Sequence, residues 1–226
     1  MSEANYHGLF DPAQYTAPIS VASDQRGLAT EHLKSMLLIR EAEKMLAHKR
    51  KHGLIGGPVH LGAGQEAVAV GVSEHLLATD HVFGAHRSHS HYLALGGTLV
   101  ALFAEILGRE LGCSKGMGGS MHLWDRSVGF SGSVPIVAGT VPLAVGAALA
   151  AKLKNENSVA IAYLGDGACE EGVVNESINL AAVMQLPVIF VVENNGYASH
   201  MHWSERQSQA FTSRFAVANE VQSVVV

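Results

Sequence analysis

The stretch SVAIAYLGDGACEEGVVNESINLAAVMQLPVIFVVENNGY, residues 158–197, decides the fold. Its first apolar run, residues 159–164, predicts a buried strand. The Gly165-Asp166-Gly167 turn ends this strand, with two glycines that are free to take positive φ. An amphipathic helical pattern follows, and residues 188–192 predict a second buried strand. Strand–helix–strand units have parallel strands and a right-handed crossover, so we expect an α/β fold with a mostly parallel sheet flanked by helices.

Polar groups follow both of these strands. Parallel neighbours end at the same edge of a sheet, so Asp166 and Asn195 are expected side by side, at the edge where ligands of open α/β sheets bind. A carboxylate, an amide oxygen and loop carbonyls are the hard oxygen ligands that Mg²⁺ takes together with substrate phosphates. The backbone N–H groups of Gly167 and Ala168 open a helix and would face a phosphate. The unit therefore predicts a magnesium-diphosphate site.

The spacing within this unit is similar to a known motif. Asn195 follows Asp166 by 29 positions, and the thiamine-diphosphate motif has GDG and a terminal asparagine pair on either side of a helix and a strand. The resemblance implies that Asp166, Asn195 and the backbone carbonyl of Tyr197 ligate Mg²⁺. It also implies that Gly167 and Ala168 contact the diphosphate. The alternative is an ordinary turn and an ordinary loop end.

A second cluster, His86-Arg87-Ser88-His89-Ser90-His91, holds three imidazoles within six residues. A zinc site, a purely structural cluster and a site for an anionic substrate are all open. Structural zinc normally has cysteines or a wider histidine spacing. We favour the anion site, because a guanidinium offers a planar fork to phosphate and imidazoles exchange protons near neutral pH.

Further motifs make the resemblance specific. The segments GQEA (residues 64–67), HRSH (86–89), GCSKGMGGSMH (112–122) and the unit of residues 158–197 occur in the order found in alpha subunits of 2-oxo-acid dehydrogenases. This family of thiamine-dependent decarboxylating components includes the acetoin dehydrogenases. The resemblance extends from about residue 33 to residue 197, and it implies the thiamine-diphosphate-binding fold.

The resemblance also assigns roles outside the first unit. His86 takes the place of a family aromatic beside the diphosphate, and Arg87 becomes the phosphate-binding arginine. His89 is the candidate catalytic histidine. The backbone near Pro135 and Val137 contacts the aminopyrimidine ring of the cofactor, although Pro135 replaces a more usual glycine.

The activity implied is decarboxylation of a 2-oxo acid with thiamine diphosphate and Mg²⁺, followed by transfer of the acyl group to a lipoyl-bearing acyltransferase. In the family the glutamate that activates the cofactor belongs to a beta subunit. We therefore expect an oxidoreductase that is active only with a beta subunit, in an α2β2 heterotetramer. The alternatives are the N-terminal module of a split transketolase-like enzyme and a non-catalytic binding or scaffold subunit.

Composition excludes other classes of function. The net charge of −5 gives no reason to expect nucleic acid or a lipid surface as a partner. Hydrophobic residues make up 48% of the chain, but many are small and 24 glycines accompany them, which favours close packing and a large subunit interface over a membrane protein. Two cysteines do not make a disulfide framework, so we expect a reducing, cytoplasmic setting.

We divide the chain into an N-terminal arm, residues 1–27, and one thiamine-diphosphate-binding α/β domain, residues 28–226. This domain is expected to be short at its C-terminus relative to the family. Thr30 is expected to cap the first helix, which has a rough stripe of Leu33, Leu37, Arg40, Met45 and Leu46. Residues 130–137 are expected to be irregular, and residues 205–218 to have helical character. Residues 221–226 are expected to begin another strand.

Overall fold

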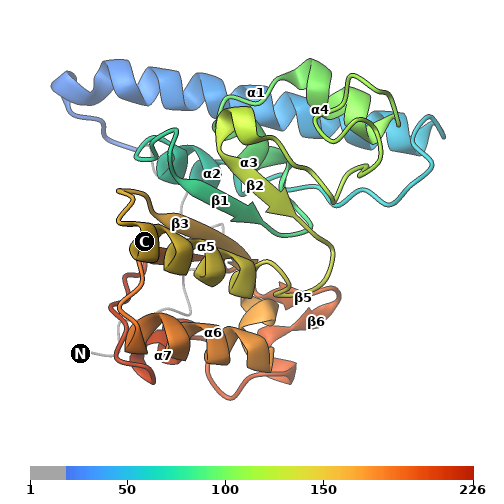
Figure 1. Cartoon of the computed structure of the whole chain (residues 1–226). Helices are drawn as coiled ribbons and strands as arrows, with labels where there is room; N and C mark the ends of the chain where they lie inside the picture. Colours follow the sequence, from blue (N-terminus) through green and yellow to red (C-terminus); the bar gives the residue numbers. More distant parts are fainter. Residues whose placement is uncertain (1–18) are drawn as a thin grey trace.

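The computed structural model describes residues 19–226. Its helices alternate with strands along the chain (Figure 1). The helices are η3 (Ser23–Gln25), α1 (Arg26–Lys51), α2 (Glu66–Ser73), α3 (His89–Ala94), α4 (Leu99–Ile106), η4 (Arg126–Val128), α5 (Val141–Lys154), η5 (Asp166–Glu170), α6 (Gly172–Val183), η6 (Trp203–Glu205) and α7 (Ser213–Val217). The strands are β1 (His81–Gly84), β2 (Phe130–Ser133), β3 (Ala160–Gly165), β4 (Val188–Glu193), β5 (Tyr197–Ala198) and β6 (Met201–His202).

The main sheet has four strands in the order β2-β1-β3-β4, and every neighbouring pair is parallel. The longest pairing joins β3 to β4, from Ala160 opposite Val188 to Gly165 opposite Glu193. A separate antiparallel hairpin joins β5 to β6. The predicted α/β fold with a mostly parallel sheet flanked by helices is therefore confirmed.

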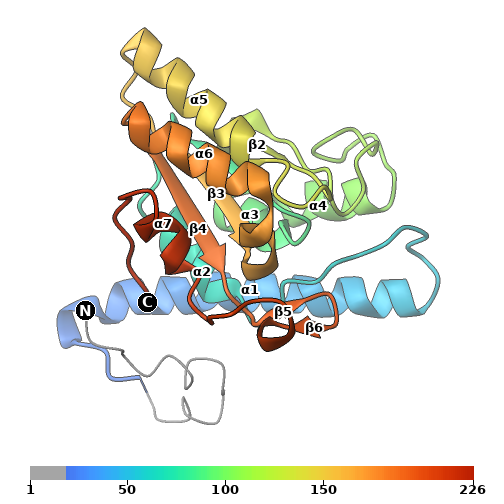
Figure 2. The ribbon, with the colours of Figure 1, turned by 90° about the horizontal axis from the view of Figure 1, so that it is seen from below.

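Strand β3 is buried on both faces, which is why its sequence is continuously apolar. Ile161 and Tyr163 point into a core with α1, α2, α3 and α4, whereas Ala162 and Leu164 point into a core with α5 and α6. Figure 1 shows the sheet between these two groups of helices, and Figure 2 shows α5 and α6 lying across one face of it. The molecule thus has three layers, and the small side chain of Ala162 lets α5 pack close to the sheet.

Several local signals act as expected. Thr98 caps α4, since its hydroxyl oxygen accepts a hydrogen bond from the N–H of Ala101 at 3.1 Å. Pro142 lies in the first turn of α5, where its missing N–H costs no intrahelical bond. The unit of residues 158–197 forms β3, a helix and β4, with α6 beginning at Gly172 after the short η5 turn.

Other expectations are wrong. Thr30 does not cap the first helix, because α1 begins at Arg26 and the Thr30 hydroxyl donates to the Arg26 carbonyl inside it. Residues 130–133 form β2 rather than an irregular segment. Residues 221–226 form no strand, and Val221 instead packs against the core between the sheet and α5–α6. The helical character expected over residues 205–218 is confined to the 3-10 turn ending at Glu205 and to α7.

The buried face of α1 also differs from the expected stripe. The predicted Leu46 is buried, together with Ile39, Ala42 and Glu43. The predicted Leu33, Leu37 and Met45 are instead each about half exposed. A carboxylate on the inner face breaks the apolar periodicity from which the stripe was predicted. The expected N-terminal arm cannot be compared in full, since residues 1–18 lie outside the described residues and α1 already begins at Arg26.

Candidate active site at the carboxyl edge of the sheet

The four parallel strands end at one edge, and each predicted site segment follows one of them. In the order of the sheet these segments are residues 135–137 after β2, 86–87 after β1, 166–168 after β3 and 195–197 after β4. The chain leaves β1 toward β2 on one side and leaves β3 toward β4 on the other. The switch point, where ligands of open α/β sheets bind, therefore lies between His86-Arg87 and Asp166.

A histidine that was not predicted from the sequence lies beside His86. The ring of His60 lies edge-on to the ring of His86, with 5.1 Å between centroids. Burial, and then the positive charge of Arg87, lowers the pKa of both imidazoles, so both are neutral at pH 7. Arg87 donates through Nη1 to the Leu61 carbonyl at 2.5 Å, which fixes the guanidinium while most of its donors are left for a ligand.

His89 lies beneath this edge, with none of its surface exposed. Its Nδ1 is 3.2 Å from both carboxylate oxygens of Glu43, and its Nε2 is 2.8 Å from the Ser120 hydroxyl. Glu43 is buried on α1, and Ser120 belongs to the glycine-rich segment. Contact between His89 and a substrate would require movement of the segment around Ser120, so the catalytic role of His89 stays a prediction.

His91 has a structural environment. Its ring stacks on Tyr163 with centroids 3.7 Å apart, and its nitrogens lie 3.2 Å from Ser88 Oγ and from Glu193 Oε1. His89 and His91 thus turn to different partners. Among residues 19–226, no group of three or more histidine, cysteine, aspartate or glutamate side chains could hold a metal ion, which argues against the zinc interpretation.

The glycine-rich segment of residues 112–122 is organised by one carboxylate. Glu105 is fully buried, and its two oxygens accept hydrogen bonds at 2.7–3.1 Å from four backbone N–H groups. The donors are Ser114, Gly116, Gly118 and Gly119. A Cβ on Gly118 would lie 2.0 Å from the His122 carbonyl oxygen, so the loop requires glycine there. The loop in turn holds Ser120 against His89.

The turn after β2 carries Pro135 and Val137. The Thr140 hydroxyl ties this turn to the end of β1 by donating to the Gly84 carbonyl at 2.8 Å. Val137 is 52% exposed at this turn. These observations place the turn beside His86 and Arg87 and leave its predicted contact with a cofactor ring as a prediction.

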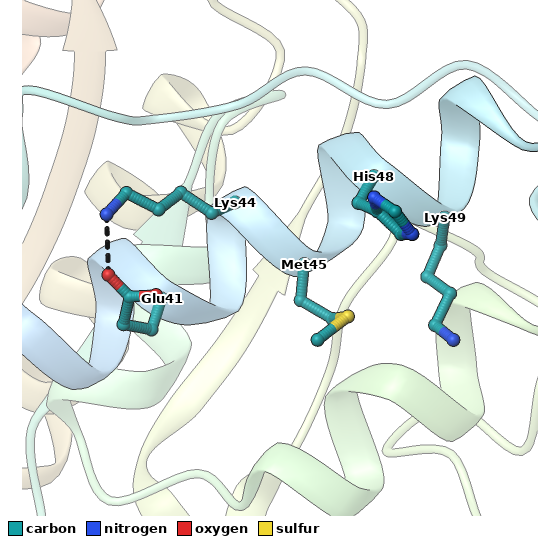
Figure 3. Close-up of a pocket in the computed structure, with 5 residues that line it drawn as sticks. All are labelled: Glu41, Lys44, Met45, His48 and Lys49. Atoms are coloured by element: carbon teal, nitrogen blue, oxygen red, sulfur yellow. Dashed lines mark hydrogen bonds and ion pairs between the residues drawn. The ribbon is translucent and has the colours of Figure 1, made fainter.

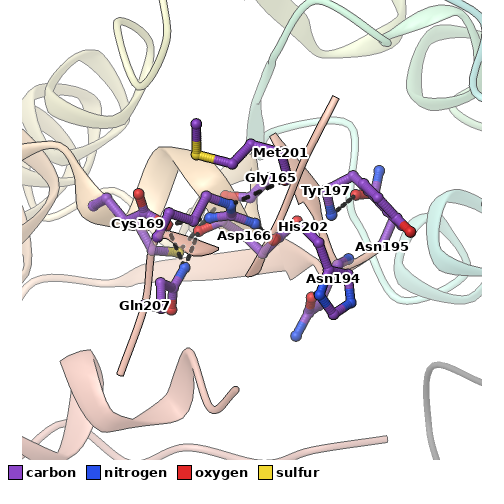
Figure 4. A network of polar contacts seen from close by, with 12 residues as sticks. Gly165, Asp166, Cys169, Asn194, Asn195, Tyr197, Met201, His202 and Gln207 are labelled. Carbon is purple, nitrogen blue, oxygen red and sulfur yellow. Dashed lines mark hydrogen bonds and ion pairs between the residues drawn. The ribbon is translucent and has the colours of Figure 1, made fainter. Parts of the chain in front are cut away.

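Asp166 is buried and is already paired (Figure 4). Arg206 donates through Nη2 to Asp166 Oδ2 and through Nη1 to Glu170 Oε1. Gln207 adds bonds to Glu170 and to the Asp166 carbonyl. Burial, and then the negative charges of Asp166 and Glu170, raises the pKa of the nearby Cys169 thiol to about 12, so this thiol stays protonated and is not a nucleophile.

Gly167 and Ala168 lie in the tight η5 turn, and neither glycine of the GDG turn takes a positive φ. Glycine is required at position 167 for a steric reason and not for its backbone conformation. A Cβ there would lie 2.7 Å from the Ala198 Cβ, so glycine is needed because β5 packs directly on the turn. The backbone of Gly167 is thereby held at the edge of the sheet, where a diphosphate contact is predicted.

Asn195 and Tyr197 bond to each other rather than to Asp166, with the Tyr197 N–H donating to Asn195 Oδ1 at 3.0 Å (Figure 4). The Asn195 oxygen keeps a second lone pair, so the donor types at this edge (a carboxylate, an amide oxygen and a backbone carbonyl) fit magnesium. The arrangement fits less well, because Arg206 takes the carboxylate. The residues present thus suit a divalent ion once this arginine has moved.

Surface hollows lie elsewhere, on the outer face of α1. One is lined by Glu41, Lys44, Met45, His48 and Lys49 (Figure 3). Its Glu41 and Lys44 pair with each other at 2.6 Å and point toward no common centre. The second, which we call the α1–α4 groove, is lined by Leu37, Leu38, Glu41, Ala42, Met45, Leu99 and Phe103. Neither contains a predicted site residue, so the sheet edge is the better candidate for chemistry.

Several functional candidates were not predicted from the sequence. His60, Glu43, Glu105, Glu193 and Arg206 each contact or adjoin a predicted residue. Glu105 could have been found as the one carboxylate in the otherwise apolar sequence of α4. Glu43 stands among the other charged residues of α1, so its sequence context does not distinguish it. No signal in the sequence pairs Arg206 with Asp166, since this contact depends on how the β5–β6 hairpin folds back.

In the described part of the chain, residues 19–226, no helix has the length and apolar character needed to cross a membrane. Both cysteines, Cys113 and Cys169, are free.

Comparison with known proteins identifies the relatives of this chain. A family model described as "Dehydrogenase E1 component" matches residues 34–226. The alpha subunit of acetoin:2,6-dichlorophenolindophenol oxidoreductase from Cupriavidus necator is 47% identical over 175 residues, which are 77% of this chain and 52% of that protein. The Bacillus subtilis protein of the same name is 47% identical over 164 residues, 73% of this chain and 49% of that protein.

The pyruvate dehydrogenase E1 component subunit alpha of Rhizobium meliloti is 43% identical over 184 residues, which are 81% of this chain and 53% of that protein. The chain therefore spans about half the length of the curated relatives it matches.

Proposed function

The chain belongs to the dehydrogenase E1 component family, and on this basis we propose that it acts as the alpha subunit of a 2-oxo-acid dehydrogenase decarboxylating component. The observation that carries the proposal is the meeting of all four predicted segments at one sheet edge, in a chain of this family. The relatives named above are alpha subunits of acetoin and pyruvate enzymes. The family match favours this function over a transketolase-like one.

We propose thiamine diphosphate and Mg²⁺ as cofactors. When bound, thiamine diphosphate supplies the carbanion chemistry that removes CO₂ from a 2-oxo acid. Asp166, Asn195 and the Tyr197 carbonyl would hold the ion, and the N–H groups of Gly167 and Ala168 would face the diphosphate. Pro135 and Val137 would present backbone groups to the aminopyrimidine ring.

Arg87 would neutralise the diphosphate and orient it, because a guanidinium fixed by the Leu61 carbonyl needs little reorganisation on binding. The neutral imidazoles of His60 and His86 can accept or donate a proton beside it. His89 would act from below, through Ser120 or after a shift of the glycine-rich segment, as the catalytic histidine.

A beta subunit, completing an α2β2 heterotetramer, and a lipoyl-bearing acyltransferase are the proposed partners, since the names of the relatives describe subunits of larger components. The free thiols of Cys113 and Cys169 support a reducing, cytoplasmic setting.

Calorimetric titration tests this function. Thiamine diphosphate with Mg²⁺ is titrated into the whole chain alone, and then into an equimolar mixture with a beta subunit of the acetoin or pyruvate enzyme. Binding confined to the mixture would place the cofactor at a shared interface, as proposed. Absence of binding in both cases would overturn the catalytic proposal and favour a scaffold subunit. Binding by the chain alone would keep the cofactor assignment and remove the requirement for a partner.

A further inference from the structure

The pairing of Arg206 is unusual for a residue at a proposed cation site. Its guanidinium bonds to two carboxylates, Asp166 and Glu170, and its Nε lies 3.4 Å from the Met201 carbonyl oxygen. The side chains of Arg206 and Asp166 are only 6% and 2% exposed. A buried ion pair of this kind strongly resists loss of either partner, because the remaining charge would be left without compensation.

The fold of the chain around Arg206 positions its charge at the GDG turn. The β5–β6 hairpin reverses the chain after Tyr197, and the N–H groups of Arg206 and Gln207 both donate to the Trp203 carbonyl, at 3.0 and 2.8 Å. Gly167 lets Ala198 lie directly on the turn. Residues 198–207 thus form one segment that covers the GDG turn, and we call it the covering segment.

We propose that Arg206 is an internal counter-cation, which takes the place of a divalent ion at Asp166 and must leave before that ion binds. This inference rests on the proposed function for the identity of the ion. A guanidinium and Mg²⁺ cannot both sit against one buried carboxylate, since like charges at that separation repel strongly in a poorly hydrated site. Binding of the ion is then coupled to displacement of the covering segment.

The coupling has a thermodynamic consequence. A ligand that binds only one of two states has an apparent affinity reduced by the fraction of molecules in that state. The form in which Asp166 is paired with Arg206 does not bind the ion, so a stable pair weakens binding. Release of Arg206 also frees a positive charge at the switch point, where it can face a diphosphate. An ion pair with a purely structural role would neither weaken binding of the ion nor release a positive charge when the ion binds.

The test uses the whole chain and Mn²⁺ alone as the probe, followed by electron paramagnetic resonance. Arg206→Gln removes the competing charge and keeps a hydrogen-bond donor, so Mn²⁺ affinity should rise by roughly tenfold or more. Arg214→Gln is the matched control, because it removes the same charge from the same region and Arg214 contacts Gln207 and Ser208 but neither carboxylate. The Mn²⁺ affinity of Arg214→Gln should stay near that of the wild type.

Hydrogen exchange in the unmodified chain gives a second measurement that does not depend on the variant folding. Saturating Mg²⁺ should accelerate exchange of the amides of residues 203–207, as Arg206 leaves and the covering segment loosens. Slower or unchanged exchange would overturn the coupling. Equal Mn²⁺ binding by the wild type and Arg206→Gln, including none by either, would overturn the competition.

These outcomes are separate from the fate of the proposed function. Tighter Mn²⁺ binding by Arg206→Gln without any thiamine diphosphate binding, even with a beta subunit, would keep the counter-cation and overturn the enzyme. Cofactor binding by the wild type, with no gain in Mn²⁺ affinity in Arg206→Gln, would keep the enzyme and overturn the counter-cation.

Discussion

Single buried carboxylates fix the position of a loop and of a histidine side chain in this molecule. Glu105 holds the glycine-rich segment through four backbone donors, and Glu43 holds His89. Hydrogen bonds to a charged acceptor are stronger than neutral ones, and the four N–H donors lose this acceptor if the carboxylate is removed. A loop that would be too rich in glycine to stay ordered is therefore fixed by one side chain.

The first prediction concerns this anchor. Glu105→Ala should lower the free energy of unfolding by about 3 kcal/mol, because several N–H groups lose their acceptor and the segment of residues 112–122 loses its order. Urea denaturation measures the change, and Glu110→Ala, an exposed carboxylate five residues further on, is the control. A loss no larger than that of the control would show that the segment is held in another way.

The second prediction concerns phosphate recognition. Arg87→Lys keeps the charge but loses the planar fork and the Nη1 bond to Leu61, so affinity for thiamine diphosphate should fall by roughly tenfold, or about 1.4 kcal/mol. Calorimetry with the partner subunit present measures it, and Arg109→Lys at an exposed position is the control. Unchanged affinity would remove Arg87 from the phosphate site.

Among the secondary-structure elements, α1 and α2 are joined by an ion pair with two bonds. Arg40 on α1 donates to both oxygens of Glu66, at 2.5 and 2.8 Å, and the Gly64 N–H also reaches this carboxylate. The bond from Arg40, opposed by burial and supported by backbone donors, lowers the pKa of Glu66 from 4.5 to about 2. The contact fixes the start of α2 against the long first helix.

The third prediction follows from the sign of this shift. A pKa lower in the folded state gives stability that is present above pH 4.5 and is lost as the pH falls toward 2. The shift corresponds to on the order of 3 kcal/mol, and solvent screening at the 41% exposed Arg40 side chain reduces this to about 2 kcal/mol.

Glu66→Gln should therefore unfold more easily than the wild type at pH 7, and the difference should shrink as the pH falls through 4.5 toward 2. Urea denaturation across this range measures the difference, and Glu41→Gln, whose side chain is 65% exposed, serves as the control. A difference between wild type and Glu66→Gln that persists undiminished at pH 2.5 would contradict the assignment.

Elements with strong local signals could be predicted from the sequence. The core strands β3 and β4 are continuously apolar, and α4 and α5 carry Thr98 and Pro142 at their starts. Strand β2 could not be predicted, because Phe130-Ser131-Gly132-Ser133 has neither apolar alternation nor length. Its register with β1 shifts, and Gly132 has a φ of +144°. The run at residues 221–226 misled because Val221 packs against the core without pairing with a strand.

The candidate site was predictable to the level of the sheet edge and no further. Parallel strands necessarily bring Arg87, Asp166 and Asn195 to one edge, so topology alone places them. Side-chain partners depend on tertiary packing. Glu43 lies 46 residues before His89, and Arg206 lies 40 residues after Asp166, so no local pattern links either pair.

Considered as a whole, the molecule leaves considerable apolar surface uncovered on one side. In the α1–α4 groove, Leu37, Leu38 and Met45 are 46–52% exposed, and Leu99 is 39% exposed. Contiguous apolar surface of this kind usually marks an interface. Part of the high apolar content of the sequence thus fills the two cores on either side of the sheet, and another part lines this groove.

The fourth prediction is that the isolated chain associates with itself through this groove. Its sedimentation coefficient should rise with concentration, since apolar surface is removed from water when copies meet. The double variant Leu37→Lys/Met45→Lys places charge in the groove and should sediment as a monomer across the same range. Leu153→Lys, at a leucine that is 73% exposed near the end of α5 and outside the groove, should behave like the wild type. A wild-type chain that stays monomeric at every concentration would show that the groove alone does not drive association.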